Sequence, residues 1–242
     1  MYHPFSVADT VKTSWYIFKR NFVTITVYSV IAFIALVLVG ILFEVVISPE
    51  GFTETMVVSM LLLFVQAYTT LGLYKLIFTV IDSEYYEFEF KQVVPTIKMV
   101  FSYLAVAFII GFFVTNFNFL VEFLDKYPAI VDYVRDAGVI VALYIALRFM
   151  FFNTFIVDDH SGPLESLRQS LELTKGYLLK LLAVLLIIVI FIALPAKLSQ
   201  YYPLVSLTII FTYPFVNIIL AVTYRKLIYS HQDLDDAPAE TK

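Results

Sequence analysis

An arginine inside one of the most apolar stretches of the chain is the residue best suited to binding chemistry. Arg148 lies near the middle of a predicted membrane span at residues 138–157, where insertion scales assign an arginine a cost of about 2.5–3.5 kcal/mol. Such a residue faces the interior of a helix bundle and finds polar partners there. The available polar groups are those of Asn116, Asn118, Glu122 and Glu44, together with backbone carbonyl groups, and Asn153 could extend the polar region inward. The pattern predicts either a polar pocket for an anionic ligand or lipid headgroup, or a structural site of interhelical hydrogen bonds.

A second polar group interrupts the last apolar stretch of the chain. Asn217 and Tyr213 lie on either side of Pro214. A proline inside a helix removes one backbone hydrogen bond and bends the helix. We interpret this segment either as a hinge in the last span or as a static kink, and Asn217 is a further candidate for binding a ligand or a lipid.

Three consecutive residues, Asp158, Asp159 and His160, are of types that bind metals. Neighbouring residues cannot all point at one ion without further ligands, so we expect a turn with an acidic helix cap instead. The chain has no cysteine, which excludes disulfides, thiol catalysis and cysteine-bound zinc. We find no intramembrane acid pair, no Ser–His dyad, no HExxH motif and no nucleotide-binding loop. We therefore expect no catalytic residue, no metal site, no cofactor and no enzymatic activity.

The composition is that of a membrane protein, with 61% hydrophobic and 15% charged residues and a net charge of −4. The negative charge argues against nucleic acid as a partner, because phosphate binding requires a basic surface. Long apolar runs without the alternation of a β-barrel predict an all-α bundle. The predicted spans are residues 22–48, 56–82, 98–125, 138–157, 177–197 and 204–228.

Lysine and arginine are distributed unequally between the two ends of these spans. Eleven lie in the two termini and in the second-to-third and fourth-to-fifth connections, whereas three lie in the other connections. Positive residues are concentrated on the cytoplasmic side of inner-membrane proteins. We therefore expect both termini in the cytoplasm and an exterior loop in "DKYPAIVDYVRD". Residues 1–230 form a single six-span domain in this interpretation, and residues 231–242 are an acidic, disordered tail.

Two polar segments have the pattern of amphipathic helices that lie flat on the inner face of the membrane. In the segment 163–175, Leu164, Leu167 and Leu171 share one face, which we expect to contact the bilayer. The N-terminal segment "SVADTVKTSWYIFKRN" has a similar pattern. A third and weaker copy lies in "KQVVPTIKMVFSY", where Pro95 interrupts it.

These segments predict three parallel repeats, each with one interfacial helix and one two-span hairpin, at residues 4–82, 83–158 and 159–228. An offset of 156 residues aligns Thr10 with Ser166, Ser14 with Ser170 and Lys19 with Lys175. Chance similarity between amphipathic helices is the alternative explanation.

The stretch "FIVDDHSGPLESLRQSLELTKGYLLKLLAVLLI", together with "FSVADTVKTSWYIFKRNF" and "YPFVNIILAVTYRKL", resembles bacterial six-span integral-membrane families of unknown function. These families are similar to the membrane domain attached to some glycerophosphoryl diester phosphodiesterases. The resemblance implies an architecture and a bacterial inner membrane, but no reaction. The catalytic domain of those enzymes is missing from this chain.

We predict a non-enzymatic inner-membrane protein that interacts with the lipid bilayer or serves as an accessory or scaffold subunit for a membrane-protein partner in the cell envelope. The alternative is a small transporter or channel with a solute path near Arg148. A continuous line of polar residues in the bundle interior would favour transport, whereas one isolated polar site would favour the first interpretation.

Overall fold

The computed structural model describes residues 5–47, 51–82 and 90–235, and these residues are helical with no strand among them. The elements are α1 (Val7–Arg20), α2 (Phe22–Ile47), α3 (Phe52–Asp82), α4 (Phe90–Val93), α5 (Ile97–Leu124), α6 (Pro128–Phe149), α7 (Phe152–Asp158), α8 (Pro163–Leu173), α9 (Leu178–Ser199), the 3₁₀ helix η1 (Pro203–Thr208) and α10 (Ile209–Asp235). The prediction of an all-α fold is confirmed.

Six of the described segments are long and apolar enough to cross a membrane, as predicted. They are residues 22–46, 52–82, 91–124, 130–158, 178–199 and 203–230. Their apolar side chains indicate a membrane protein, because most of α2 and much of the other long helices remain exposed in the isolated chain. Lipid is the environment that such surfaces require.

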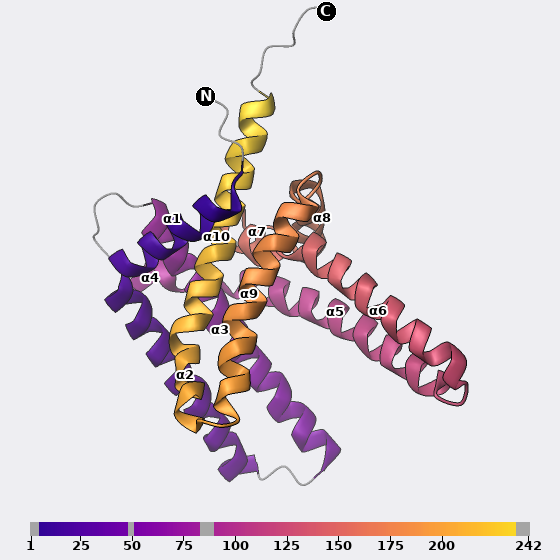
Figure 1. Cartoon of the computed structure of the whole chain (residues 1–242). Helices are drawn as coiled ribbons and strands as arrows, with labels where there is room; N and C mark the ends of the chain where they lie inside the picture. Colours follow the sequence, from indigo (N-terminus) through magenta and orange to yellow (C-terminus); the bar gives the residue numbers. More distant parts are fainter. Residues whose placement is uncertain (1–4, 48–50, 83–89, 236–242) are drawn as a thin grey trace, which may run out of the picture.

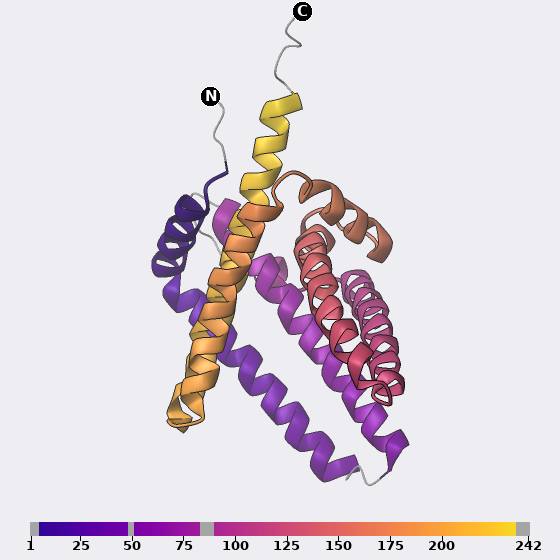
Figure 2. The ribbon, with the colours of Figure 1, turned by 45° about the vertical axis from the view of Figure 1, so that its right-hand side comes forward.

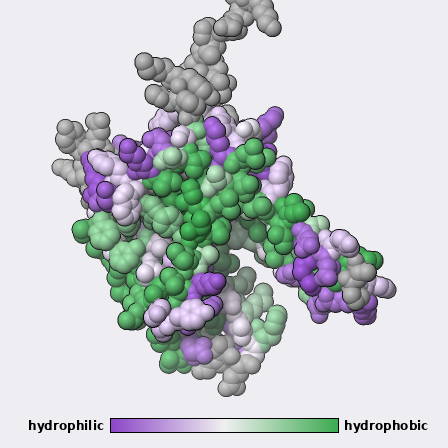
Figure 3. All heavy atoms as spheres, viewed as in Figure 1, coloured by the Kyte–Doolittle hydropathy of each residue, from purple (hydrophilic) through white to green (hydrophobic). Residues whose placement is uncertain are grey.

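The short helices and both ends of the described chain lie at one end of the bundle, which we call the proximal end (Figure 1). The end of α2, the start of α3 and the turns that connect α5 to α6 and α9 to α10 lie at the opposite, distal ends. The three hairpins diverge from the proximal end toward their turns (Figures 1 and 2). Hydrophilic residues gather at the proximal rim and at the tip of the α5–α6 hairpin, with hydrophobic surface between them (Figure 3).

The packing of the short helices follows one rule at all three hairpins. The short helix before each hairpin contacts the last helix of another hairpin: α4 contacts α3, α8 contacts α7 and α1 contacts α10. The first long helices follow the same order, since α5 contacts α3, α9 contacts α6 and α2 contacts α10. This cyclic arrangement has the order that three repeats would produce, while the sequence repeat itself remains a prediction.

Three predicted boundaries differ from the structure. The third amphipathic segment is divided at Pro95: its first residues lie in the single turn α4, and its last seven begin the long helix α5 at Ile97. Most of the predicted exterior loop "DKYPAIVDYVRD" is the first part of α6, which begins at Pro128. A proline fits the first turn of a helix, where its missing N–H costs nothing. Of the predicted acidic tail, residues 231–235 continue α10, and residues 236–242 lie outside the described residues.

Candidate functional site

Arg148 lies at a break between helices rather than in the middle of one. It is in the last turn of α6, and the chain resumes a helix only at Phe152. The Nη1 group of Arg148 donates a hydrogen bond to Thr174 Oγ1 at 2.9 Å. Its Nε atom is buried and has no hydrogen-bond partner among the described residues. The side chain therefore connects the end of α6 to the end of α8 at the proximal end of the bundle.

Ser170 of α8 connects the two backbone groups on either side of this break. Its hydroxyl donates to the Arg148 carbonyl oxygen at 2.8 Å and accepts from the Phe151 N–H at 3.2 Å. Carbonyl groups at the end of a helix have no partner within the helix, and a buried one is costly. The hydroxyl of Ser170 satisfies one such carbonyl and the buried N–H that follows it.

The buried face of α8 is therefore not the expected leucine face. Ser166, Leu167, Ser170 and Leu173 are buried, whereas Leu164 is 70% exposed. The three leucines do not share one environment, so the expectation that they form a single face against the bilayer is wrong. Small hydroxyl side chains allow α8 to approach the backbone of the α6–α7 break, which leucines at those positions would prevent.

The structure does not bring Asn118 and Glu122 to Arg148. Both are exposed on α5, in its distal half. In the antiparallel α5–α6 hairpin Asn118 lies opposite residue 134, about 20 Å along the helix axis from Arg148 at 1.5 Å per residue. Asn153 lies close to Arg148 in sequence, and its Oδ1 atom is buried without a partner among the described residues. The fifth candidate, Asn217, is in α10, where its Nδ2 group donates to the Tyr213 carbonyl oxygen at 2.8 Å.

A groove between α2, α3 and α10 is a further site, which sequence patterns do not indicate as a whole. Its volume is about 270 Å³, and apolar side chains such as Ala32, Leu62 and Leu73 form most of its wall. Its polar groups come from all three helices: Tyr28 and Ser29, Gln66, Thr69 and Thr70, and Tyr213. No charged side chain lines it.

The hydroxyl groups of this groove form two interhelical hydrogen bonds. Tyr28 of α2 donates to the Thr69 carbonyl oxygen of α3 at 2.8 Å. The hydroxyls of Thr70 in α3 and Tyr213 in α10 are 3.0 Å apart. Each helix of the groove is thus linked to another by a tyrosine. Sequence patterns indicate only Tyr213 and Pro214 of this site, because α10 is far from α2 and α3 in the chain.

Close helix packing positions one of these tyrosines. A side chain at Gly72 of α3 would collide with the Tyr28 hydroxyl and would lie 3.2 Å from the Val93 carbonyl oxygen of α4. Glycine is therefore the residue that lets Tyr28 cross the face of α3.

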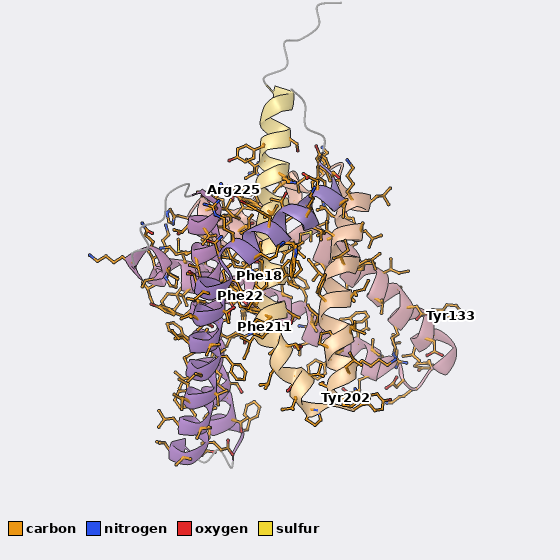
Figure 4. The ribbon with its side chains drawn as sticks, turned by 60° about the vertical axis from the view of Figure 1, so that its left-hand side comes forward. Phe18, Phe22, Tyr133, Tyr202, Phe211 and Arg225 are labelled. Carbon is orange, nitrogen blue, oxygen red and sulfur yellow. The ribbon has the colours of Figure 1, made fainter. Side chains whose placement is uncertain are left out.

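Aromatic stacking holds α1 and α2 against α10 beside the groove (Figure 4). The rings of Phe22 and Phe211 are stacked with centroids 5.8 Å apart. Phe18 contacts both Phe22 and Phe215, with centroids 5.5 Å apart in each pair. Lys226 also forms an ion pair with Asp9 of α1. These contacts hold α10 against α1 and α2, and with it one wall of the groove.

An ion-pair cluster at the proximal end joins α3, α7 and α10. Arg225 forms two hydrogen bonds of 3.0 Å with the Asp158 carboxylate and one of 2.6 Å with Asp82. Tyr224 donates to Asp158 at 2.9 Å, and the guanidinium carbon of Arg225 lies 4.8 Å from the centre of the Phe78 ring. Figure 4 shows Arg225 at this end of the molecule, with Tyr133 and Tyr202 at the distal ends. Asp158 is therefore a structural ion-pair partner and not simply a cap.

The two residues after Asp158 form the expected turn. Burial raises the pKa of the Asp159 carboxyl, and the Asp158 carboxylate adds to this rise, while Arg225 opposes it. His160 has a positive φ of 55°. Among the described residues no group of three or more His, Cys, Asp or Glu side chains is placed to hold a metal ion.

Comparison with protein families identifies a match over residues 90–224 to a domain of unknown function, DUF7847. This segment is more than half of the chain. The chain belongs to the DUF7847 family. The DUF7847 segment runs from α4 to Tyr224 of α10 and contains the Arg148 junction, Asp158 and the α10 wall of the groove. The two other walls, α2 and α3, precede it.

No curated protein and no solved structure matches this chain. The similarity to the phosphodiesterase membrane domain therefore remains an expectation from the sequence, and the function must be argued from the geometry.

Proposed function

We propose that the protein is a non-enzymatic protein of the bacterial inner membrane, with both termini in the cytoplasm, that binds lipid within its membrane domain. The lysine and arginine bias supports this orientation, because the proximal end carries α1, α4 and α8 and most of the positive residues. A role as an accessory subunit of a larger assembly is compatible with the same geometry.

The groove between α2, α3 and α10 is the observation that carries the lipid-binding proposal. It lies within three helices that can span a membrane, and its wall is mainly apolar. Sites for small molecules combine an apolar wall with a few polar groups that fix orientation, and the hydroxyls of Tyr28, Thr70 and Tyr213 have this distribution.

The alternative of a transport path at Arg148 has less support. Its guanidinium group is engaged by Thr174, and its backbone carbonyl by Ser170. The polar residues Asn118 and Glu122, which a path through the α5–α6 hairpin would use, are on the exposed surface of α5. The described residues do not join them to Arg148 in a continuous polar line.

The orientation can be tested with single cysteines, since the natural chain has none. Lys12→Cys in α1 and Glu172→Cys in α8 should react with a membrane-impermeant maleimide only after the cell is opened. Asp132→Cys at the distal end of α6 should react in intact cells. The opposite labelling pattern would refute the proposed orientation.

Lipid binding can be tested by filling the groove. Ala32 lines it, whereas Ala35 on the same helix does not. We expect Ala32→Trp to reduce the lipid that co-purifies with the protein, measured by native mass spectrometry, and Ala35→Trp to leave it unchanged. Equal lipid content in both variants and in the natural protein, with unchanged gel-filtration profiles, would refute lipid binding in the groove.

A further inference from the structure

The depth of the groove in the membrane can be read from the ion-pair cluster. Asp82 and Asp158 are the last residues of the spans 52–82 and 130–158, so their cluster with Arg225 lies at the proximal end of the membrane-spanning region. Thr70 lies 12 residues before Asp82 in α3, and Tyr213 lies 12 residues before Arg225 in α10. At 1.5 Å per residue, both are about 18 Å below the cluster.

The positions of Thr70 in α3 and Tyr213 in α10 both place the polar part of the groove near the centre of the bilayer. The hydrocarbon core is about 30 Å thick, so its centre lies about 15 Å from either surface. The headgroups and ester carbonyls of phospholipids are at the surface. A phospholipid in the groove would present only its acyl chains to Gln66, Thr70 and Tyr213.

Gln66 makes an acyl chain an unsuitable occupant for this part of the groove. Its side chain is exposed at the groove, and no hydrogen bond to it is found among the described residues. An amide placed in hydrocarbon without a hydrogen bond costs several kcal/mol. The amide hydrogens of Gln66 therefore require an acceptor that lipid chains cannot provide.

The opposite wall supplies further polar atoms. Pro214 of α10 has no N–H, so the Ile210 carbonyl lacks its usual partner within the helix, and both residues line the groove. The hydroxyls of Thr70 and Tyr213 carry one hydrogen atom each, and the hydrogen bond between them uses one of the two. The other hydrogen atom can be donated to a ligand. Both donors and an acceptor thus lie within about 6 Å of one another along the helix axes, and no charged side chain is among the described residues that line the groove.

We infer that the groove binds a neutral, lipid-soluble molecule whose carbonyl oxygen accepts hydrogen bonds from Gln66 and from the Thr70–Tyr213 pair, the chemistry that an isoprenoid quinone presents. An uncharged ring fits a site without charged side chains, and an isoprenoid tail can leave along the apolar wall into the bilayer. The volume of about 270 Å³ suits the ring rather than the whole molecule. This inference rests on the proposed lipid-binding function and specifies the ligand.

The test uses the full chain in lipid nanodiscs with menaquinone-4 as the probe. Quinones quench tryptophan emission, and the single tryptophan, Trp15, contacts Phe215, one residue beyond Pro214. We expect saturable quenching as the mole fraction of menaquinone-4 rises. Loss of one hydrogen bond should weaken binding about three- to tenfold in Gln66→Leu. Asn118→Leu, a matched amide on the exposed face of α5, should bind as the natural protein does.

Squalene provides a second control, because it is an isoprenoid without a carbonyl group. We expect it not to displace menaquinone-4. Relief of the menaquinone-4 quenching by an equal mole fraction of squalene, or equal affinities of Gln66→Leu and the natural protein, would overturn the proposed hydrogen bond to a carbonyl.

These outcomes separate the two proposals. If Ala32→Trp loses bound lipid but Gln66→Leu binds menaquinone-4 normally, the groove is a lipid site and the inference about its ligand is wrong. If Ala32→Trp leaves the lipid content unchanged, the lipid-binding function itself is wrong.

Discussion

The guanidinium group of Arg225 and the carboxylate of Asp158 form a bidentate ion pair that connects α10 to the end of α7, with two hydrogen bonds of 3.0 Å. Both side chains are only 19% exposed. Paired planar groups of this kind are the strongest ion pairs in proteins. The contact links residues 67 positions apart and closes the proximal end of the bundle.

Removal of one partner of this ion pair should destabilise the protein strongly. Asp158→Asn leaves Arg225 with a partly buried positive charge and only the more exposed Asp82 as a partner. The loss of a buried partner costs about 3–5 kcal/mol, so we expect the Tm in detergent to fall by roughly 6–20 °C. Arg135→Gln removes an exposed ion pair at the distal end and should cost less than about 1 kcal/mol. Equal effects of the two variants would show that the cluster does not stabilise the fold.

The hydroxyl of Ser170 should be required for the junction between α6, α7 and α8. Ser170→Ala leaves the Arg148 carbonyl and the buried Phe151 N–H without a partner, which should cost about 1–3 kcal/mol. Differential scanning fluorimetry of the purified protein measures the change. Arg168→Gln on the exposed face of α8 breaks an ion pair between side chains that are 80% and 65% exposed, and its Tm should hardly move. A Ser170→Ala variant as stable as Arg168→Gln would contradict the bridging role of the serine.

The close contact between Gly72 and Tyr28 predicts a destabilising effect with a specific rescue. Gly72→Ala should cost about 1–3 kcal/mol, because the added methyl group forces the Tyr28 hydroxyl to move. Tyr28→Phe in the same chain should recover part of this loss, which a double-mutant cycle measures as coupling between the two positions.

Gly111 provides a control for this helix-glycine substitution. A Cβ atom there meets nothing within 4 Å, so Gly111→Ala should leave stability unchanged or raise it by about 0.5–1 kcal/mol. Additive effects of Gly72→Ala and Tyr28→Phe would refute the contact.

Asp159 gives the fold a defined dependence on pH. Its pKa in the folded protein is raised by burial and by Asp158, so the folded state holds the Asp159 proton more tightly than the unfolded state does. The folded state therefore loses stability as the pH rises from the ordinary aspartate pKa of 3.8 through the higher folded value. Above the folded pKa, the ionised Asp159 carboxylate lowers the free energy of unfolding by a constant amount.

Asp159→Asn should accordingly be more stable than the natural protein at pH 7. Asparagine keeps an oxygen that can accept the hydrogen bond from Gln169, and it removes the charge beside Asp158. The difference in Tm should disappear below pH 4, where the natural side chain is protonated as well. A difference that stays constant over this range would contradict the proposed origin of the pKa shift.

Several features of the fold follow from local patterns that a sequence shows directly. Long apolar runs locate the six spans, with starts up to eight residues from the observed ones, because a chain in lipid must satisfy its backbone hydrogen bonds internally. The polar composition of residues 163–175 locates α8, which ends at Leu173. The unequal distribution of lysine and arginine predicts an orientation for these helices.

The partners of the polar side chains could not be predicted in the same way. Arg148 was expected in mid-span with Asn118 or Glu122, but the helix ends one residue after it and its partner is Thr174 of α8. Sequence periodicity indicated that the leucines of α8 share a face, although the buried face is built around Ser166 and Ser170. The buried face of α8 is set by the backbone groups that the α6–α7 break leaves without partners within a helix. Sequence periodicity does not show where such a break occurs.

The sequence by itself determined the helical class, the number of spans and the presence of short polar helices, since these depend on the solvation of each segment separately. Only the tertiary structure decided which segments meet. The groove of Tyr28, Gln66 and Tyr213 and the ion pair of Arg225 with Asp158 each combine helices that are far apart in the chain. Such contacts depend on the rotation and crossing of whole helices, because the polar groups must find partners once water is absent.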